Sequence, residues 1–217
     1  MPSPRRALLL FPAALAALAV AGCSVGDDGP RTTQTRDVAD FTRIANSGSV
    51  DVRLHVGESK RLRVSAGENV IDDVRTEVSD DGTLHLTFDH HGFGGGDVVV
   101  EASVPKLTGI DASGSGDIAA DGIDTDAFEV RSHGSADIAL AGTAGRLVID
   151  LSGSGDADLA SLAAREAHVS VNGSGDVNVR ADERLDVSVA GSGDVRYHGH
   201  PALTQNVDGS GDLTRAG

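Results

Sequence analysis

Residues 169–179 read Val-Ser-Val-Asn-Gly-Ser-Gly-Asp-Val-Asn-Val, and this stretch decides the fold. Apolar valines alternate with polar residues on both sides of the central Gly-Ser-Gly-Asp. Because successive side chains of a β-strand point to opposite faces, each flank has one apolar face and one polar face. The two glycines between the flanks indicate a sharp turn. The stretch therefore predicts a strand, a turn and a second strand.

The same unit recurs through the second half of the chain. Gly-Ser-Gly-Asp begins at Gly114, Gly153, Gly173, Gly191 and Gly209, and the variant Gly-Ser-Ala-Asp begins at Gly134. The spacings between successive copies are 20, 19, 20, 18 and 18 residues. Positions two and four residues before each first glycine, and one and three after each aspartate, are mostly apolar. Such a unit cannot bury its apolar face alone, whereas stacked neighbours form one continuous core.

The near-constant period predicts an all-β fold, a right-handed parallel β-helix (β-solenoid) whose stacked coils have 18–20 residues each. Successive coils are expected about 4.8 Å apart. A narrow two-layer interior suits small branched side chains, and the chain has no Trp and one Tyr. The alternative is an antiparallel meander with a hairpin at each Gly-Ser-Gly-Asp. In the last unit Gln205 and Arg215 replace apolar residues, as expected of a terminal coil that caps the stack.

The first half of the chain is less regular. Alternation predicts strands at residues 41–56, 61–66, 74–79, 83–89 and 97–104. Residues 47–51, Ser-Gly-Ser-Val-Asp, look like a degenerate copy of the turn, and residues 90–96, His-His-Gly-Phe-Gly-Gly-Gly, read as a loop. We therefore expect the same stack to continue backwards with insertions.

The N-terminus reads as an export and anchoring signal. Arg5 and Arg6 precede an apolar run that is too short for a comfortable membrane-spanning helix. The residues that follow, Val20-Ala21-Gly22-Cys23, resemble the bacterial lipobox, in which the cysteine is lipidated and becomes the new N-terminus. Residues 1–22 are thus expected to be a lipoprotein signal peptide that uses the general export route. We expect the mature protein on the outer side of the cell membrane, held there by lipid.

Behind the expected anchor, residues 23–37 are small, polar and contain Pro and Gly, which predicts a flexible tether with a lipidated Cys23. The repetitive β-domain is expected to occupy residues 38–217. Cys23 is the one cysteine of the chain, so no internal disulfide can form.

The net charge of −15 argues against nucleic acid as a partner, because binding phosphates needs a basic surface. Acidity on this scale keeps a protein soluble, and it is also compatible with calcium or with basic partners.

The aspartates of the repeated turn form the main candidate site. In a solenoid they would stand in a line, and neighbouring carboxylates would repel each other by about 1 kcal/mol in water. One interpretation is structural, with each carboxylate accepting N–H bonds within its own turn. The other is Ca²⁺ held between coils, since calcium takes six to eight oxygen ligands, although the motif only partly resembles the calcium-binding repeat Gly-Gly-x-Gly-x-Asp. The residues are Asp117, Asp137, Asp156, Asp176, Asp194 and Asp212.

Other candidate chemistry is sparse. His90, His91, His198 and His200 could bind a transition metal, but no ligand cluster at a recognised spacing accompanies them, so no metal or other cofactor is expected. The serine of the turn recurs in every unit, whereas a catalytic serine would be unique. No phosphate-binding glycine motif occurs, and no pair of carboxylates stands out for acid–base chemistry.

The order of short motifs resembles one bacterial family. Phe41-x-x-Ile44, the turn at residues 47–52, Asp81-Gly82-Thr83-Leu84, and Val104-Pro105-x-Leu107 leading into residues 113–117 are similar to the auto-transporter adhesin, head GIN domain family. The resemblance covers roughly residues 38–215. It implies a β-helical envelope protein, often a lipoprotein, with no established enzymatic activity and no catalytic residue that maps onto this chain.

Three functions follow as hypotheses. The first is a membrane-anchored, non-catalytic binding or structural module that contacts an envelope protein or a polysaccharide through many weak contacts. The second is a calcium-stabilised stalk. The third is a polysaccharide-processing β-helix enzyme, which the scarcity of aromatic platforms disfavours. The oligomeric state stays open, since the ends of a stack could pair.

Overall fold

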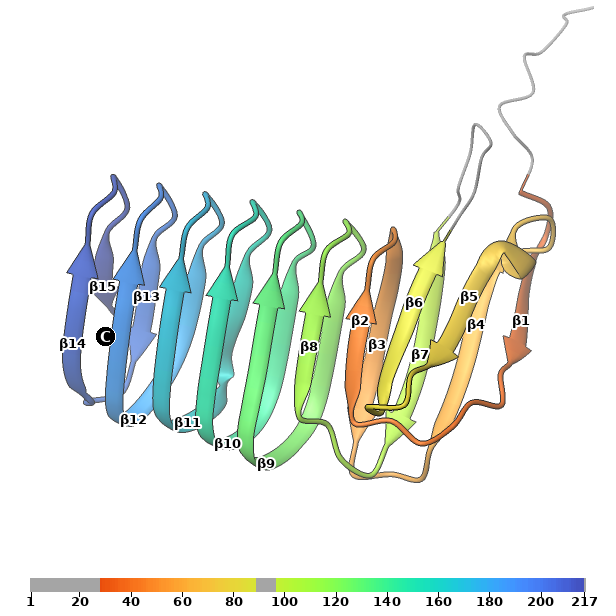
Figure 1. Ribbon diagram of the computed structural model, residues 1–217, viewed down its shortest axis with the longest axis horizontal. Coiled ribbons are helices and arrows are strands. Elements are labelled where there is room, and N and C mark those ends of the chain that lie inside the picture. The colour runs from red at the N-terminus through yellow and green to blue at the C-terminus, as the bar shows by residue number, and fades with distance from the viewer. Residues whose placement is uncertain (1–27, 89–96, 217) are drawn as a thin grey trace, which may run out of the picture.

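The computed structural model describes residues 28–88 and 97–216. Cys23, the lipobox residues, His90 and His91 lie outside the described residues, so their roles stay predictions. The described chain forms an elongated stack of β-coils with one short 3₁₀ helix, η1 (Ile71–Asp73), near its N-terminal end (Figure 1). No helix among these residues has both the length and the apolar character that crossing a membrane requires.

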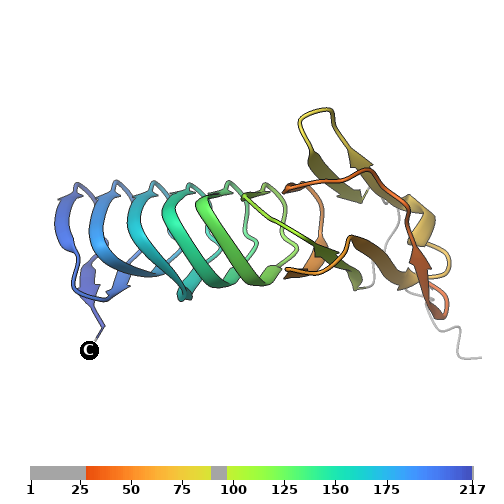
Figure 2. The ribbon, with the colours of Figure 1, turned by 90° about the horizontal axis from the view of Figure 1, so that it is seen from below.

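Four long strands form the regular part of the stack, and each pairs in parallel with the next: β9 (Ile118–Ser132), β10 (Ile138–Leu151), β11 (Ala157–Val171) and β12 (Val177–Val189). Each strand crosses one face of the solenoid, bends round its edge and returns on the opposite face, so that successive coils follow one axis (Figures 1 and 2). β13 (Val195–His198), β14 (Ala202–Val207) and β15 (Leu213–Arg215) complete the last coil. The parallel pairing confirms the β-solenoid and excludes the antiparallel meander.

The Gly-Ser-Gly-Asp turns, which we call corners, align along the edge opposite the bends (Figure 1). We call this the corner edge. The strands that run into a corner form the front face, and the strands that leave it form the back face. Between the two faces, apolar side chains stack in columns, as the aligned and buried Val130, Ile149, Val169 and Val187 illustrate. Burial of each such side chain stabilises the fold by about 1.5–3 kcal/mol.

The first glycine of each corner is required by close backbone approach. A Cβ atom on Gly173 would lie 2.0 Å from the carbonyl oxygen of Gly153 in the coil below. None of the corner glycines has a positive φ angle, so steric room between coils, and not left-handed backbone, selects glycine here. The second glycine is equally close to the coil below, since a Cβ atom on Gly155 would lie 2.1 Å from the carbonyl oxygen of Ala136. The fully buried Ala136 itself shows that one coil nevertheless accommodates a methyl group at this position.

The chain order of the first coils differs from their spatial order. β2 (Arg43–Asn46) and β3 (Val50–Val56) flank the degenerate corner, and Gly48 lies directly beneath Gly114, 66 residues later. β6 (Thr83–Phe88) and β7 (Val98–Val104) lie on the outer side of β2 and β3, while β8 (Gly109–Ala112) and β9 lie on the inner side. The expected continuation of the stack towards the N-terminus is therefore confirmed. The chain first forms the coil of β2 and β3, then the outer coil of β6 and β7, and then returns to the inner side with β8 and β9.

Antiparallel strands close the N-terminal end of the stack. β4 (Arg61–Gly67) pairs with β7, β5 (Val74–Val78) pairs with β6, and β1 (Arg31–Thr35) pairs with β4. Residues 31–35 were expected within the flexible tether, but they form β1. Their threonines have high β propensity, and the open edge of β4 offers them a hydrogen-bonding partner. The ordered β-domain thus begins before residue 38.

Candidate functional site

The corner aspartates form one hydrogen-bonded ladder along the stack. The backbone N–H of Asp137 donates to Oδ1 of Asp117 at 3.0 Å, and the N–H of Asp176 donates to Oδ1 of Asp156 at 2.8 Å. The same bond joins every consecutive pair from Asp51, in the degenerate corner, to Asp212. The structural interpretation was thus wrong in one respect, because each carboxylate accepts the N–H of the next coil and not of its own turn.

This ladder explains how a row of like charges is tolerated. Each carboxylate receives a charge-assisted hydrogen bond from the adjacent coil, and all of the corner aspartates except Asp51 are exposed to water, which screens their repulsion. Among the described residues, no group of three or more His, Cys, Asp or Glu side chains is arranged to hold a metal ion. The geometry of the aspartates is accounted for by links between coils.

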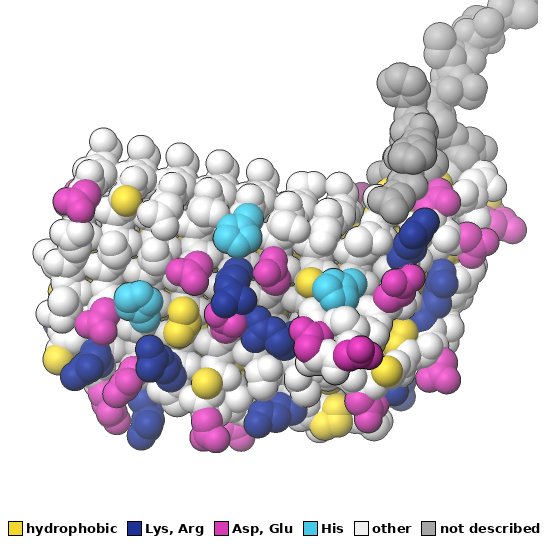
Figure 3. Space-filling model, in the orientation of Figure 1, with side chains coloured by type: hydrophobic (Ala, Val, Ile, Leu, Met, Phe, Trp, Pro, Cys, Tyr) yellow, Lys and Arg dark blue, Asp and Glu magenta, His cyan; other side chains and the backbone are white. Residues whose placement is uncertain are grey.

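The remaining predicted residues are dispersed. Nε2 of His198 lies 2.9 Å from Oδ1 of Asn178 on the neighbouring strand, and His200 is exposed. The corner serines face solvent, and the corner edge appears as a regular row of uncharged protrusions at the top of Figure 3. The residue before the first glycine varies between corners, and in one corner it is His133, whose Nδ1 lies 2.7 Å from Oγ of Ser152.

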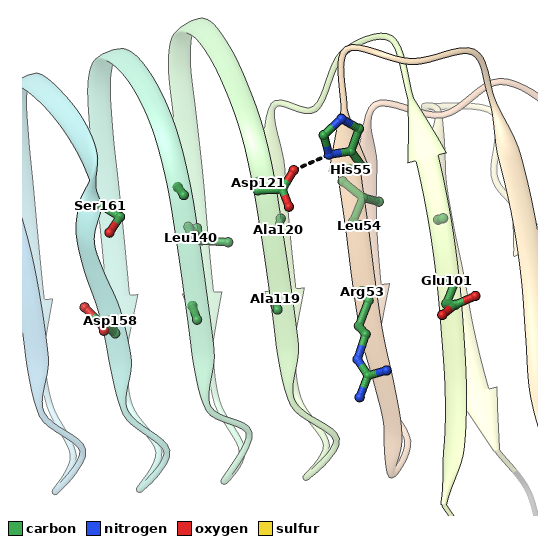
Figure 4. Close-up of a pocket in the computed structure, with 13 residues that line it drawn as sticks. Arg53, Leu54, His55, Glu101, Ala119, Ala120, Asp121, Leu140, Asp158 and Ser161 are labelled. Atoms are coloured by element: carbon green, nitrogen blue, oxygen red, sulfur yellow. Dashed lines mark hydrogen bonds and ion pairs between the residues drawn. The ribbon is translucent and has the colours of Figure 1, made fainter.

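A shallow groove of about 500 Å³ lies on the back face, and sequence reasoning missed it (Figure 4). Its floor is formed by residues that are aligned with one another on neighbouring strands. Ala119 on β9 and Ala139 on β10 lie side by side and point outward, with Arg53 of β3 on one side and Asp158 of β11 on the other. Because two methyl groups stand between two long polar side chains, the surface is hollowed there.

The far wall of the groove comes from an irregularity in β11. This strand carries extra residues relative to β10 and to β12 between Asp158 and Ala163, which is a β-bulge. Bulges re-aim side chains and are frequent beside functional sites. Here the bulge places the exposed Ser161 on the wall, and the N–H of Ala160 donates to Oδ1 of Asp158 at 3.3 Å. Nδ2 of Asn178 donates to the same oxygen at 3.2 Å, so the Asp158 carboxylate is held in place from two sides.

The near wall carries charges of both signs. His55 on β3 forms a short contact through Nδ1 with a carboxylate oxygen of Asp121 on β9 (Figure 4). Glu101 on β7 is directly opposite Arg53 in the strand register. The side chain of Arg53 is exposed, and its guanidinium makes no hydrogen bond or ion pair within residues 28–88 and 97–216. The groove therefore combines hydrogen-bond donors and acceptors around an apolar floor.

On the front face, charges of opposite sign lie on neighbouring strands (Figure 3). Arg131 lies between Asp111 and Asp150 in one register row. Glu166 lies between Arg146 and Arg184 in another. Opposite charges on adjacent strands stabilise a sheet by a few tenths of a kcal/mol each. We interpret the front face as structural and the groove as the candidate binding site.

The described residues thus form a single-stack β-solenoid with a repeated polar edge and a shallow surface groove. The chain belongs to the family described as "Putative auto-transporter adhesin, head GIN domain", whose model matches residues 40–201. The family resemblance seen in the motifs is thereby confirmed. No curated protein is significantly similar to the chain.

Solved structures share the fold. A protein from Bacteroides fragilis described as a "putative adhesin" has a TM-score of 0.70 at 23% identity, covering 86% of this chain and 97% of that chain. A "putative lipid binding protein" from Parabacteroides distasonis has a TM-score of 0.55 at 23% identity, covering 87% and 98%. A "putative adhesin" from Parabacteroides merdae has a TM-score of 0.51 at 19% identity, covering 87% and 97%. At these identities the likeness concerns the fold.

Proposed function

We propose that the protein is an extracytoplasmic lipoprotein, anchored through Cys23, whose β-solenoid is a non-catalytic binding module. The groove on the back face is the observation that carries the binding role. It brings together charged side chains from β3, β7, β9 and β11 around an apolar floor, and one of them, the guanidinium of Arg53, makes no hydrogen bond or ion pair with the residues that the structure describes.

The anchoring role is supported by where the chain enters the fold. β1 begins at Arg31, eight residues after the predicted lipidation site, and pairs with β4 in the antiparallel cap. The repeats extend from that cap (Figure 1). The groove lies on the back face and is lined by residues of β3, β7, β9, β10 and β11. A lipid at Cys23 would therefore hold the capped end close to the membrane and leave the repeats free for contacts. Several anchored copies in one membrane would combine weak contacts into firm attachment.

A detergent partition experiment tests the anchor. We expect the full chain, expressed in a bacterial host, to enter the Triton X-114 detergent phase and to carry a diacylglyceryl mass at Cys23. The variant Cys23→Ser should lose both properties. If the natural protein partitions into the aqueous phase with no lipid mass, the anchoring proposal is wrong.

Binding is tested separately with the soluble domain. Fluorescent beads coated with residues 24–217 should be retained on cell envelopes of the producing bacterium. Beads coated with a variant in which a bulky residue fills the groove, Ala139→Arg, should be retained less. Equal retention of the two bead types would remove the groove from the binding role.

A further inference from the structure

We propose that the back-face groove binds a neutral glycan chain, that is, a polymer of uncharged sugars recognised through its hydroxyl groups. The inference deepens the proposed binding function, because it names the chemical class that the same groove would take. It rests on the mixture of donors and acceptors in the lining, on the fixed orientation of one wall, and on the size of the floor.

The presence of both donors and acceptors in the lining favours a neutral ligand that can donate and accept hydrogen bonds. Arg53 donates, while Glu101 and Asp158 accept, and the acidic Asp121 is already engaged by His55. A groove for an anion would collect cations, and a groove for a cation would collect carboxylates that have no basic neighbour. Sugar hydroxyls donate and accept at the same time, so they can satisfy a lining that mixes one guanidinium with the carboxylates of Glu101 and Asp158.

The wall at Asp158 is oriented before any ligand arrives. Oδ1 accepts the N–H of Ala160 at 3.3 Å and Nδ2 of Asn178 at 3.2 Å. These bonds restrict the rotation of the carboxylate, and its Oδ2 makes no hydrogen bond or ion pair with the residues that the structure describes. Because the side chain loses little freedom on binding, a hydroxyl donated to Oδ2 costs less entropy than one donated to a free surface carboxylate.

The floor has the width and the apolarity for the C–H face of a sugar ring. Arg53 and Asp158 belong to strands separated by the two strands that carry Ala119 and Ala139, so the walls are about 14 Å apart at three strand spacings. The alanine methyl groups and the backbone between them offer an apolar strip. The groove is open to solvent and has no aromatic side chain in its lining, so we expect a single groove to bind a glycan weakly. Several copies of the protein on one membrane would together bind a glycan polymer more firmly.

The test titrates isotope-labelled protein, residues 24–217, with defined hexasaccharides and follows backbone amide signals by NMR. The neutral probes are maltohexaose, cellohexaose, laminarihexaose and mannohexaose. Hexagalacturonate serves as the anionic probe, and the fully deacetylated glucosamine hexamer serves as the cationic probe. We expect at least one neutral probe to bind with a dissociation constant in the millimolar range and to shift the amide signals of Ala119, Ala139 and Ser161.

Two variants locate the binding. Ala139→Arg fills the floor and should weaken binding by about tenfold or more, equivalent to about 1.4 kcal/mol. Thr214→Arg places the same side chain in the same register row of the back face, but on β15 away from the groove, and should bind like the unaltered protein. Both substitutions lie at exposed positions, so their unfolding transitions should match the parent.

The outcomes separate cleanly. Binding of a neutral probe that Ala139→Arg abolishes and Thr214→Arg preserves supports the proposal. The proposal is overturned if no neutral probe binds, if only a charged hexamer binds, or if Ala139→Arg binds as tightly as the parent. None of these results affects the lipid anchor, which the detergent partition of the Cys23→Ser variant tests independently.

Discussion

The guanidinium of Arg43 on β2 lies over Gly109 on β8 and reaches Glu129 on β9, with 2.9 Å between Nη2 and Oε2. A Cβ atom on Gly109 would lie 2.7 Å from Nη1 of Arg43. The missing side chain therefore allows an ion pair to span a strand. This ion pair links the coil of β2 and β3 to the regular repeats. In the sequence, the residues of the outer coil lie between these two parts.

Gly109→Ala should cost less than about 1 kcal/mol of unfolding free energy. The obstructed group is the end of a flexible side chain, so Arg43 can move aside, and a partly exposed ion pair contributes little. Urea unfolding of the variant beside Arg43→Gln measures this cost. A loss of several kcal/mol in either variant would show that the pair does more than link two exposed side chains.

Gly173→Ala should be far more harmful, on the order of 3 kcal/mol, because the added Cβ would meet the backbone carbonyl of Gly153 at 2.0 Å. Backbone in a stacked coil cannot move aside without breaking its neighbours' hydrogen bonds. The reverse substitution Ala136→Gly provides a control at the second corner position, where a methyl group is accommodated. It should change the stability by less than about 1.5 kcal/mol. Comparable losses for the two substitutions would contradict the steric account of the corner.

The aspartate ladder predicts different effects for two substitutions at one position. Asp156→Ala removes the acceptor of the Asp176 N–H, 2.8 Å away, and should cost about 1 kcal/mol. Asp156→Asn keeps an oxygen in the same place and removes one charge from the row, so its stability should equal or exceed that of the parent. Chemical denaturation of both variants at low and at high salt checks this. An Asn variant as unstable as the Ala variant would show that the charge, and not the acceptor, is needed.

Chelation distinguishes the inter-coil hydrogen bonds from bridging calcium. Because each corner carboxylate from Asp51 to Asp194 already accepts an N–H from the next coil, we expect EDTA to leave the melting temperature unchanged. Added Ca²⁺ in the millimolar range should change it no more than the same concentration of Mg²⁺ does. A rise specific to Ca²⁺ that Asp156→Asn reduces would support the calcium-stabilised stalk instead.

The turn between β5 and β6 predicts a pH effect. Hydrogen bonds from the hydroxyls of Ser79 and Thr83, at 2.6 and 3.1 Å, lower the pKa of Asp81 from its ordinary value of 3.8. Because the folded pKa lies below the unfolded pKa, this carboxylate stabilises the fold above about pH 4, and its contribution is lost as the pH falls through the folded pKa. The difference in stability between the parent and Asp81→Asn should therefore be largest near neutral pH and shrink in acid. A difference independent of pH would indicate that only the shape of the side chain matters.

The sequence by itself determined the repeated coil. The period of the Gly-Ser-Gly-Asp corners and the alternation around residues 110–120 or 169–179 are local properties, and a regular stack repeats one local solution in every coil. The presence of strands in the first half was also predictable from the sequence, since β3, β4, β6 and β7 lie where the alternation of apolar and polar residues predicts them. The corner at residues 47–51 was recognisable because it keeps its first glycine and its aspartate.

Only the tertiary structure decided which coils are neighbours and what their side chains meet. That β6 and β7 lie outside β2 and β3 depends on strand pairing across long sequence separations, which no local pattern encodes. The groove has the same origin. Ala119 and Ala139 are ordinary exposed alanines until the register places them side by side between Arg53 and Asp158, and the acceptor role of each corner aspartate appears only when the next coil stacks against it.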